Sequence, residues 1–445
     1  MANKKEKVTL PNLSKEQIDN IKNYKNSIKI ISDYAEGVRK LPGNFLGNIG
    51  TEGWKACGRE IIQNAIDECL RTNSPANHVW VTFDERNQMF MVEDNGRGLP
   101  HGMMIECIAT ERSSSNYDKE PGQGYTSGAH GLGSGVAMAL SEKYTVESYV
   151  LGEAHRVEFN KGKVWKYGEK SVKCPPKQGT YITLIPDYSV LGNVDLSCKE
   201  VYELLAGFYT KMPIGHEIDF IGIDKSGSMV YNEKLINRDG ILTDLMAKVS
   251  KPLISPICYS YDNGIMKADV AFTYDIDSVT DDEDIASFAN FTNTTDGGTH
   301  VDGFLTGLCK YLKDYMNKIY LGEKSKLVIT NADVKNGLKC VISAAHINPI
   351  FKGQFKGKIT NEEFKPFIEN LTTKALEEWA ATKPAELQKV AKYIKDLAEI
   401  RNKTDLEKVK LTSNYQTSAL GDYPKKFVNP AGNKNLELFI VEGVA

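Results

Sequence analysis

The 445-residue sequence has no long hydrophobic run, no paired cysteines and no excess of charge, and each absence excludes a class of protein. A membrane-spanning helix needs about 18 or more consecutive apolar residues, and no such stretch exists. The polar N-terminus also lacks the apolar segment of a secretory signal. Lys and Arg total 55 against 58 Asp and Glu, a formal net charge of -3. We therefore expect no membrane span and no secretion, and any contact with DNA must come from a local patch.

The eight cysteines are scattered singly along the chain, with no CxxC pair and no Cys/His spacing that suits zinc. This pattern is typical of reduced thiols in a cytoplasmic protein. The sequence also contains no internal repeat and no low-complexity segment.

The composition that remains is that of an ordinary folded chain, with 41% hydrophobic and 25% charged residues. At about 100 to 200 residues per domain, its length predicts two or three domains. Residues 1–26 are polar and Lys-rich, which indicates either a disordered tail or an arm that binds a partner. We predict a first domain over 27–245, a second over 246–410, and a linker with the start of a further strand over 411–445.

Alternating strand-like and helical segments predict an α+β fold in the first domain. The strands are expected at 79–83, 89–94, 144–150 and 179–186, with a further strand at 267–274 in the second domain. A helical stretch is expected from about residue 361. Within it a heptad-like stripe is formed by Leu387, Val390, Ile394 and Leu397. Such a stripe could also belong to a helix that packs on its own domain.

Two segments carry a pattern that suits ligand binding. The helix predicted at 58–70 places Glu60, Asn64 and Asp67 on one face, opposite a buried apolar side. The strand at 89–94 then runs into Asp-x-Gly-x-Gly, where glycines allow a flat ligand to approach the backbone and Asp94 can accept a hydrogen bond from an exocyclic amine. Taken alone, the first pattern can be a solvated face and the second an ordinary turn.

The segment 121–141 is rich in glycine and leads directly into a predicted helix. Glycines before a helix N-terminus expose backbone N–H groups to phosphate, although a flexible loop explains them equally well. The segment is not a Walker loop, because Lys-Ser/Thr does not follow its last glycine. It is not a dinucleotide fingerprint either, because a polar loop precedes it where a buried strand is required.

In this order, the helix, the DxGxG strand, the glycine-rich lid and the strand that opens with Gly179-Thr180 resemble the ATPase fold shared by DNA gyrase B proteins, Hsp90, MutL and histidine kinases. The stretches 27–50, 288–304 and 337–359 resemble type IIA DNA topoisomerases specifically. The resemblance implies a two-layer α/β sandwich ATPase domain, followed by an α/β transducer domain with a long C-terminal helix. It extends over nearly the whole chain from residue 27.

The resemblance also implies roles for individual residues. Glu60 matches the general base that polarises the attacking water, with Gln354 and Lys356 on a transducer loop that reaches the γ-phosphate. Asn64 matches the ligand of Mg²⁺, and Asp94 matches the carboxylate that reads adenine. The set expected to bind ATP is Asn64, Asp67, Asp94, Gly96, Gly98, Ser114, Ser115, Asn116, Gly128, His130, Gly131, Leu132, Gly133 and Thr180.

Some positions depart from the family pattern. Phe355 stands where the family's transducer loop has threonine. The segment 112–118 resembles the eukaryotic enzymes, whereas the lid is closer to the bacterial ones. This mixture is compatible with a bacterial, eukaryotic or viral source. We favour a viral source, which would place the protein in the host-cell cytoplasm. Residues 435–445 resemble the start of a TOPRIM domain, in which Glu442 could match a metal-binding glutamate, but Val444 replaces the expected aspartate.

The resemblance thus predicts an ATP-hydrolysing gate of a type IIA DNA topoisomerase. ATP would dimerise two chains around a transported segment of double-stranded DNA, and hydrolysis would reset the clamp. We expect no DNA cleavage by this chain alone, and a partner subunit or domain that carries TOPRIM and the cleavage tyrosine. The rival prediction is an Hsp90- or MutL-like protein clamp. A histidine kinase is disfavoured, because no histidine precedes the ATP site in a two-helix hairpin.

Overall fold

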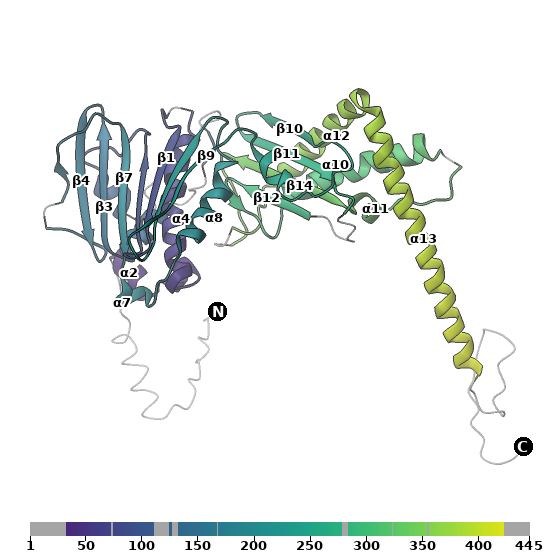
Figure 1. Ribbon diagram of the computed structural model, residues 1–445, viewed down its shortest axis with the longest axis horizontal. Helices are drawn as coiled ribbons and strands as arrows, with labels where there is room; N and C mark the ends of the chain where they lie inside the picture. The colour runs from purple at the N-terminus through teal and green to yellow at the C-terminus, as the bar shows by residue number, and fades with distance from the viewer. Residues whose placement is uncertain are drawn as a thin grey trace, which may run out of the picture.

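The computed structural model describes residues 33–72, 74–110, 124–126, 132–166, 168–277, 284–322, 324–353 and 356–421, with side chains up to residue 404. It has two α/β domains in a row, and a long helix extends from the second (Figure 1). The predicted N-terminal arm at 1–26 and the TOPRIM-like strand with Glu442 lie outside the described residues.

The first domain is built on a nine-stranded sheet in the order β5-β4-β3-β7-β2-β1-β8-β9, with β6 paired to β4. Its strands are β1 (His78–Asp84), β2 (Met89–Asp94), β3 (Ser141–Val150), β4 (Glu153–Asn160), β5 (Lys163–Val164), β6 (Lys170–Ser171), β7 (Gly179–Pro186), β8 (Glu217–Ile223) and β9 (Met229–Ile236). All pairs are antiparallel except β1 with β8. The four strands predicted in this domain are confirmed as β1, β2, β3 and β7.

Helices cover one face of this sheet. They are α2 (Tyr34–Lys40), α3 (Gly43–Leu46), α4 (Gly50–Cys69), α5 (Met104–Ala109), α6 (Gly133–Ala139), α7 (Tyr188–Leu191) and α8 (Cys198–Tyr209). In β1, Val79, Val81 and Phe83 are buried in the core with α4 and α8, whereas Trp80 on the opposite face is 37% exposed. A strand whose side chains alternate between buried and exposed has one face against the core. The predicted two-layer sandwich is therefore confirmed.

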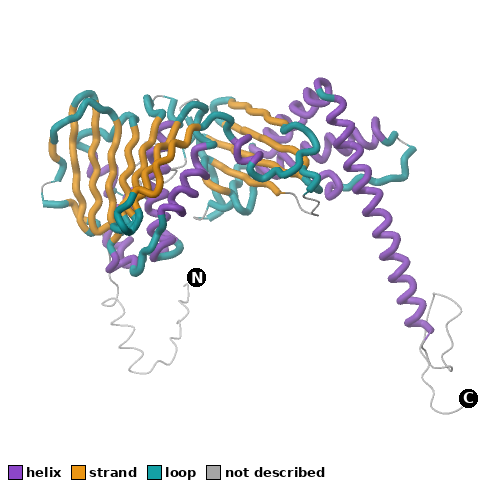
Figure 2. The backbone as a smooth tube through the Cα atoms, viewed as in Figure 1, coloured by secondary structure: helices purple, strands orange, loops and turns teal. Residues whose placement is uncertain are grey.

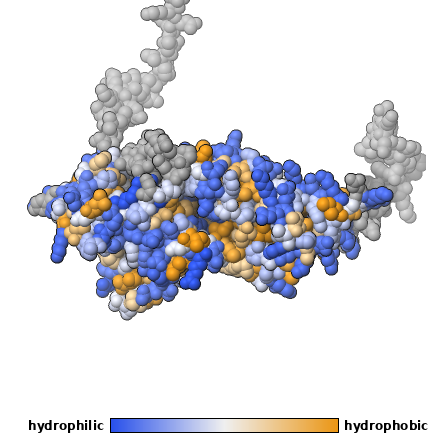
Figure 3. All heavy atoms as spheres, turned by 90° about the horizontal axis from the view of Figure 1, so that it is seen from above, coloured by the Kyte–Doolittle hydropathy of each residue, from blue (hydrophilic) through white to orange (hydrophobic). Residues whose placement is uncertain are grey.

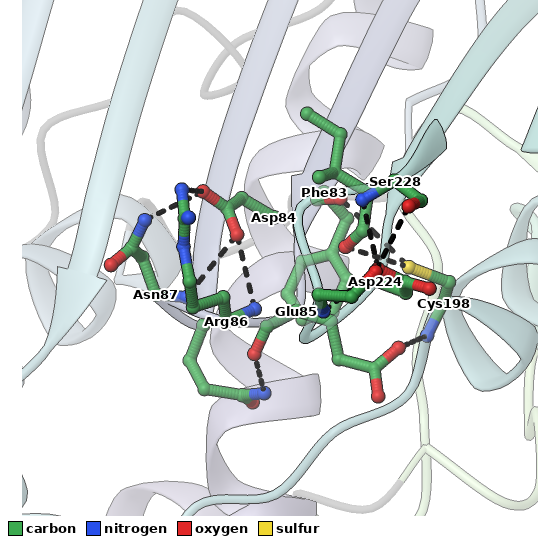
Figure 4. A network of polar contacts seen from close by, with 11 residues as sticks. Phe83, Asp84, Glu85, Arg86, Asn87, Cys198, Asp224 and Ser228 are labelled. Carbon is green, nitrogen blue, oxygen red and sulfur yellow. Dashed lines mark hydrogen bonds and ion pairs between the residues drawn. The ribbon is translucent and has the colours of Figure 1, made fainter. Parts of the chain in front are cut away.

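A polar network closes one end of the sheet (Figure 4). The Glu85 carboxylate in the β1–β2 turn accepts a hydrogen bond from the backbone N–H of Cys198, 3.1 Å away, at the start of α8. The Cys198 thiol in turn faces the Phe83 carbonyl at 3.9 Å. In the β8–β9 turn, the Asp224 carboxylate accepts from the N–H of Ser228 at 2.9 Å. Since β2 begins at this end, its last residue, Asp94, and the DxGxG motif that starts there lie at the other end of the sheet.

The second domain contains a five-stranded sheet in the order β10-β11-β14-β12-β13. Its elements are α9 (Ile241–Met246), β10 (Ile257–Asp262), β11 (Met266–Tyr274), β12 (Asp284–Ala289), β13 (Thr292–Asn293), α10 (Thr299–Tyr315), the π-helix η1 (Met316–Tyr320), α11 (Asn331–Lys335), β14 (Leu338–His346), α12 (Phe364–Thr382) and α13 (Pro384–Gly421). Phe272 on β11 packs against Phe304 of α10, with ring centroids 5.4 Å apart. Its neighbour Ala271 packs with α9 on the other face. Both faces of this sheet are therefore covered.

The helical stretch predicted from residue 361 is two helices, because the chain breaks at Lys383. Pro384 follows, and a proline disfavours helical backbone at the residue before it. Leu387, Val390 and Ile394 of the predicted stripe are buried in the core of the second domain. The alternative that this helix packs on its own domain is thus confirmed for the first part of α13. The remainder of α13 projects away from the body of the molecule (Figure 2).

One face of the molecule can be seen in the space-filling view of Figure 3. Seen from above, it is largely hydrophilic, with smaller hydrophobic groups near the middle of its length (Figure 3). Within the described ranges, none of the helices combines the length and the hydrophobicity needed to cross a bilayer.

Candidate functional site

The predicted Glu60 and Asn64 meet the first turn of α6. Gly133 begins this helix, and a Cβ atom at Gly133 would lie 2.1 Å from the Glu60 Oε2 atom. Only a residue without a side chain lets the helix start so close to the carboxylate. One turn along α4, Asn64 Nδ2 donates a hydrogen bond to Ser134 Oγ at 2.9 Å. The spacing of four residues therefore places both side chains at the same end of α6.

Asp94 ends β2 in a buried position, with 5% of its surface exposed. Its Oδ1 atom accepts a hydrogen bond from the backbone N–H of Gly96 at 2.8 Å. Burial raises the pKa of Asp94 to about 7, although hydrogen bonds from the Gly96 and Thr180 backbones oppose the shift. A carboxyl group this deeply buried gains from any ligand that donates a hydrogen bond to it.

The strand beside Asp94 approaches it unusually closely. Thr180 of β7 lies directly opposite Asp94 in the sheet register and is 8% exposed. The preceding Gly179 has a φ of 122°, and a Cβ atom there would lie 1.8 Å from the Asp94 carbonyl oxygen. Only glycine is compatible with that backbone and that contact. The predicted pair of Asp94 and Thr180 is therefore held together by local backbone geometry.

The DxGxG loop is anchored by an ion pair that the sequence did not reveal. Glu68, in the last turn of α4, receives two hydrogen bonds from the Arg97 guanidinium, at 2.9 and 2.7 Å. Burial alone would raise the pKa of Glu68, but the Arg97 and Arg71 charges outweigh it and lower the pKa. A Cβ atom at Gly96 would lie 3.0 Å from the Glu68 Cβ, so the loop runs along the helix. The arginine inside the glycine motif was the available signal for this contact.

The remaining predicted residues of the first domain lie partly inside and partly outside the described ranges. Gly98 has a φ of 74° and packs against β3, where a Cβ would meet Val150 at 2.7 Å. Asp67 is buried on α4. The Leu132 carbonyl accepts a hydrogen bond from the Tyr34 hydroxyl at 3.4 Å. Seven predicted site residues, six of them in this domain, lie outside the described residues: Ser114, Ser115, Asn116, Gly128, His130, Gly131 and Gln354.

In the second domain, the stretches 288–304 and 337–359 come together. The backbone N–H of Asp296 donates to the Gly357 carbonyl at 2.9 Å, and Gly298 forms a parallel bridge with Ile359. Lys356 lies in this second stretch with a φ of 52°, and its ammonium group is 5.8 Å from the centre of the Phe351 ring. The two stretches that resemble a transducer domain thus bond to each other directly after Lys356.

Residues 124–126, near the start of the glycine-rich segment 121–141, connect the two domains. Gly124 passes over the end of α4, where a Cβ would lie 2.2 Å from the Leu70 carbonyl oxygen. The Tyr125 hydroxyl donates to Asp262 Oδ1 in the second domain at 2.5 Å. Asn290 Nδ2 donates to the Thr126 carbonyl at 2.9 Å. The sequence analysis missed this connection, because its partners are 137 and 164 residues apart.

Comparisons with known proteins match both domains in the same order. A family model described as "Histidine kinase-, DNA gyrase B-, and HSP90-like ATPase" matches residues 57–189, and one described as "DNA gyrase B" matches residues 231–410. The DNA gyrase B protein of Mycoplasma pneumoniae is 28% identical over 444 residues, which cover 94% of this chain and 66% of that protein. The corresponding protein of Thermus thermophilus is 29% identical, over 92% of this chain and 64% of that protein. The chain spans about two thirds of the length of these relatives.

Solved structures agree with these matches. The 43K ATPase domain of Thermus thermophilus gyrase B, in complex with an aminocoumarin, superposes with a TM-score of 0.67 at 26% identity, covering 84% of this chain and 97% of that one. The ATPase region of Saccharomyces cerevisiae topoisomerase II has a TM-score of 0.58 at 18% identity, covering 82% and 100% of the two chains. At that identity, the second similarity concerns the fold alone.

Proposed function

This chain is an ATPase and transducer region of the type II topoisomerase family, and we propose that it works as an ATP-operated gate for duplex DNA. The observation that carries the proposal is that α4 contacts both ends of the site. Its residue Glu60 meets the start of α6, and its last turn supports the loop after Asp94. ATP bound along α4 would thus have its adenine at one end and its γ-phosphate at the other. In the gate, ATP binding closes two chains and hydrolysis opens them.

The side chains at the α6 end of the site suit hydrolysis. Glu60 would act as the general base that polarises water for attack on the γ-phosphate. Mg²⁺ binds oxygen ligands, and the amide nitrogen of Asn64 already donates to Ser134. The amide oxygen of Asn64 is therefore the atom that would hold Mg²⁺ on the phosphates, where the ion would neutralise charge that develops during the reaction.

The side chains at the β2 end suit adenine. Asp94 would accept a hydrogen bond from the exocyclic amine, with Thr180 beside it through a water molecule. Gly96 and Gly98 would let the base lie against the backbone of the loop. The predicted contributions of Asp67, the 114–116 segment and the lid glycines with His130 belong to the same proposal.

Lys356 would connect the second domain to the phosphate. Together with Gln354, it would reach the γ-phosphate when the second domain swings onto the first. A ligand shifts such an equilibrium only through contacts that differ between the two states. Lys356→Ala should therefore slow hydrolysis and leave the open arrangement favoured with ATP bound, which a distance label in each domain can measure. A variant that compacts as fully as the parent would assign the coupling to other residues.

The gyrase B relatives support double-stranded DNA as the substrate, a homodimer as the ATP-bound state and a separate DNA-cleaving subunit or domain as the partner. The N-terminal residues 1–26 would serve as an arm between the two chains, and the cytoplasm would be the location. The second candidate is an Hsp90- or MutL-like protein clamp. The match of the DNA gyrase B model to 231–410 favours the topoisomerase, because that match covers the second domain.

The test measures ATP turnover of the chain with increasing concentrations of duplex DNA. A DNA gate should show turnover that rises with DNA, whereas a protein clamp should not respond. In parallel, sedimentation with a non-hydrolysable ATP analogue and Mg²⁺ should convert monomer to dimer, and deletion of residues 1–26 should weaken that dimer. Turnover indifferent to DNA, with no change of mass, would overturn the proposal.

A further inference from the structure

We propose that His101, Glu153 and His155 form a binding site for a divalent transition-metal ion on the first domain. One potential ligand atom from each of the three side chains lies within 4.8 Å of the other two. These residues take no part in the proposed ATP site, so the metal site stands independently of that function. Its ligand chemistry, two imidazoles and one carboxylate, is typical of zinc, cobalt or nickel rather than of magnesium or calcium.

The fold brings the three residues together from two segments. Glu153 and His155 alternate on β4 and therefore point to the same face of the sheet. His101 follows the DxGxG loop, and its ring stacks on that of His155 with centroids 3.9 Å apart and an interplanar angle of 8°. In Figure 1, β4 lies at the end of the sheet away from the second domain, so the site is remote from the interdomain contacts.

The hydrogen bond of His101 decides which ring nitrogen offers a lone pair when the ring is neutral. Its Nε2 atom lies 3.2 Å from the Ser148 carbonyl oxygen, and a carbonyl can only accept, so Nε2 carries the hydrogen. In the neutral ring Nδ1 then presents a lone pair. This Nδ1 atom faces the Glu153 Oε2 at 3.8 Å. Two acceptors that face each other at this separation leave room for a cation between them.

His155 is oriented in the way that metal-binding histidines are. Its Nδ1 atom is 2.6 Å from Glu169 Oε1, which also accepts a hydrogen bond from the Gly102 N–H at 2.6 Å. A carboxylate that holds one nitrogen of an imidazole leaves the other, here Nε2, to bind the metal.

The geometry also predicts a site that closes on the ion. With zinc–nitrogen distances of about 2.0 to 2.1 Å, two ligand atoms of a tetrahedral site lie roughly 3.4 Å apart. The ligand atoms of the three side chains lie up to 4.8 Å apart in this structure, so they must come closer together to bind the ion. The rings must tilt toward each other, and the Glu153 side chain, 78% exposed, must move inward. An exposed glutamate can make that movement at little cost, and water can complete the coordination.

Metal binding at this site would act on the loop that follows Asp94. Ser148 already holds this loop, because its Oγ accepts from the Leu99 N–H and donates to the Leu99 carbonyl, both at 2.8 Å. A bound ion would add a second connection between His101 and β4. If the proposed ATP site is correct, the ion should change nucleotide affinity modestly, by less than about tenfold. This effect rests on the proposed function, whereas metal binding itself does not.

The test titrates the full chain with Co²⁺ and follows visible absorption, with Zn²⁺ as the competitor that removes the signal. The parent chain should bind one equivalent through nitrogen and oxygen ligands. His101→Ala, His155→Ala and Glu153→Gln should each weaken binding at least tenfold, and Glu169→Gln by about 10 to 100-fold. His216→Ala, in a loop of the same domain, is the matched control and should bind as the parent does.

Two results would overturn the site. One is equal cobalt binding by the parent and Glu153→Gln or His101→Ala. The other is absorption dominated by thiolate-to-cobalt charge transfer, which would assign the metal to cysteines, since all eight remain in these variants. Thermal unfolding of each apo variant separates lost binding from lost folding. The exposed Glu153→Gln substitution should leave the fold intact, so loss of binding in this variant reports on the ligand itself.

Discussion

The two domains use their buried polar side chains in different ways. In the first, Asp94 is buried with its pKa raised to about 7, and the Glu60 carboxylate is placed against the first residue of α6. In the second, Asn361 bonds to the Asn348 carbonyl and the Ile350 N–H, so that its amide fixes the chain after β14. Asp94 is thus buried at a cost that a ligand can recover, whereas Asn361 fixes the shape of its own domain.

The largest expected effect is on the rate of ATP hydrolysis, and it distinguishes a catalytic role of Glu60 from a structural one. Glu60→Gln should slow ATP hydrolysis by about two to four orders of magnitude, because a positioned general base contributes that much. The amide has nearly the shape of the carboxylate and should still fit beside Gly133. Steady-state turnover measures the loss, and calorimetry should find nucleotide affinity nearly unchanged. Full turnover in the variant would remove Glu60 from the mechanism.

Asp94→Asn should weaken ATP binding while it stabilises the domain. Loss of a hydrogen bond to a charged group costs about 1.5 to 3 kcal/mol, or roughly 10 to 150-fold in affinity. The folded pKa of Asp94 is raised from 3.8 to about 7, so the folded domain binds more protons and loses stability as the pH rises through that range. The asparagine variant avoids this penalty and should unfold at a higher temperature above pH 7.

The same carboxyl group predicts how ATP affinity depends on pH. Since the ionised form accepts from adenine, affinity should fall as the pH drops below about 7, and Asp94→Asn should lack this component. Calorimetry in two buffers that differ in ionisation enthalpy counts the protons released. Phosphate ionisation is common to both chains and cancels in the comparison. Unchanged ATP affinity in the variant would withdraw the adenine assignment.

The sequence was most informative where neighbours along the chain decide the structure. The 3.6-residue period placed Glu60 and Asn64 correctly on one face, and alternation predicted β1, β2, β3 and β7. The sequence could not show that the Glu60 carboxylate packs against Gly133, because that contact depends on where α6 begins. It predicted one helical stretch where Pro384 separates two, although the proline itself was the signal.

Contacts between distant segments were beyond the reach of these patterns. The ion pair of Glu68 with Arg97 and the bond of Asn290 to Thr126 join residues that no periodicity relates. The same holds for the cluster of His101 with His155, which depends on a loop lying against β4. The roles that came from resemblance alone, such as those of Lys356 and Gln354, stay predictions.

A smaller effect is expected from removing the Asn290 side chain, which bonds across the boundary between the two domains. Asn290 is fully buried and has a φ of 43°, and its amide donates to the Thr126 and His346 carbonyls. Asn290→Ala removes both donors and should cost about 1 to 3 kcal/mol. Hydrogen exchange should increase at the β14 end and in residues 124–126 together. Asn290→Gly is the control, because it loses the amide but relieves the left-handed backbone.

The smallest effect tests whether the second domain responds to pH in the opposite sense from the first. His300 is fully buried, its Nε2 is 3.2 Å from Thr294 Oγ1, and burial lowers its pKa from 6.5 to about 3. The unfolded chain therefore binds the proton first, so stability is complete above about pH 6.5 and declines as the pH falls toward 3. Between pH 7.5 and 5.5 the free energy of unfolding should fall by about 1.4 kcal/mol, because pH 5.5 lies one pH unit below the unfolded pKa.

His300→Gln keeps a side chain that can bond Thr294 but cannot titrate, so its unfolding free energy should change by that much less over the same interval. Because all other titrating groups are common to both chains, an equal pH dependence in the two would mean that His300 is protonated inside the folded domain, and the contrast with Asp94 would then fail.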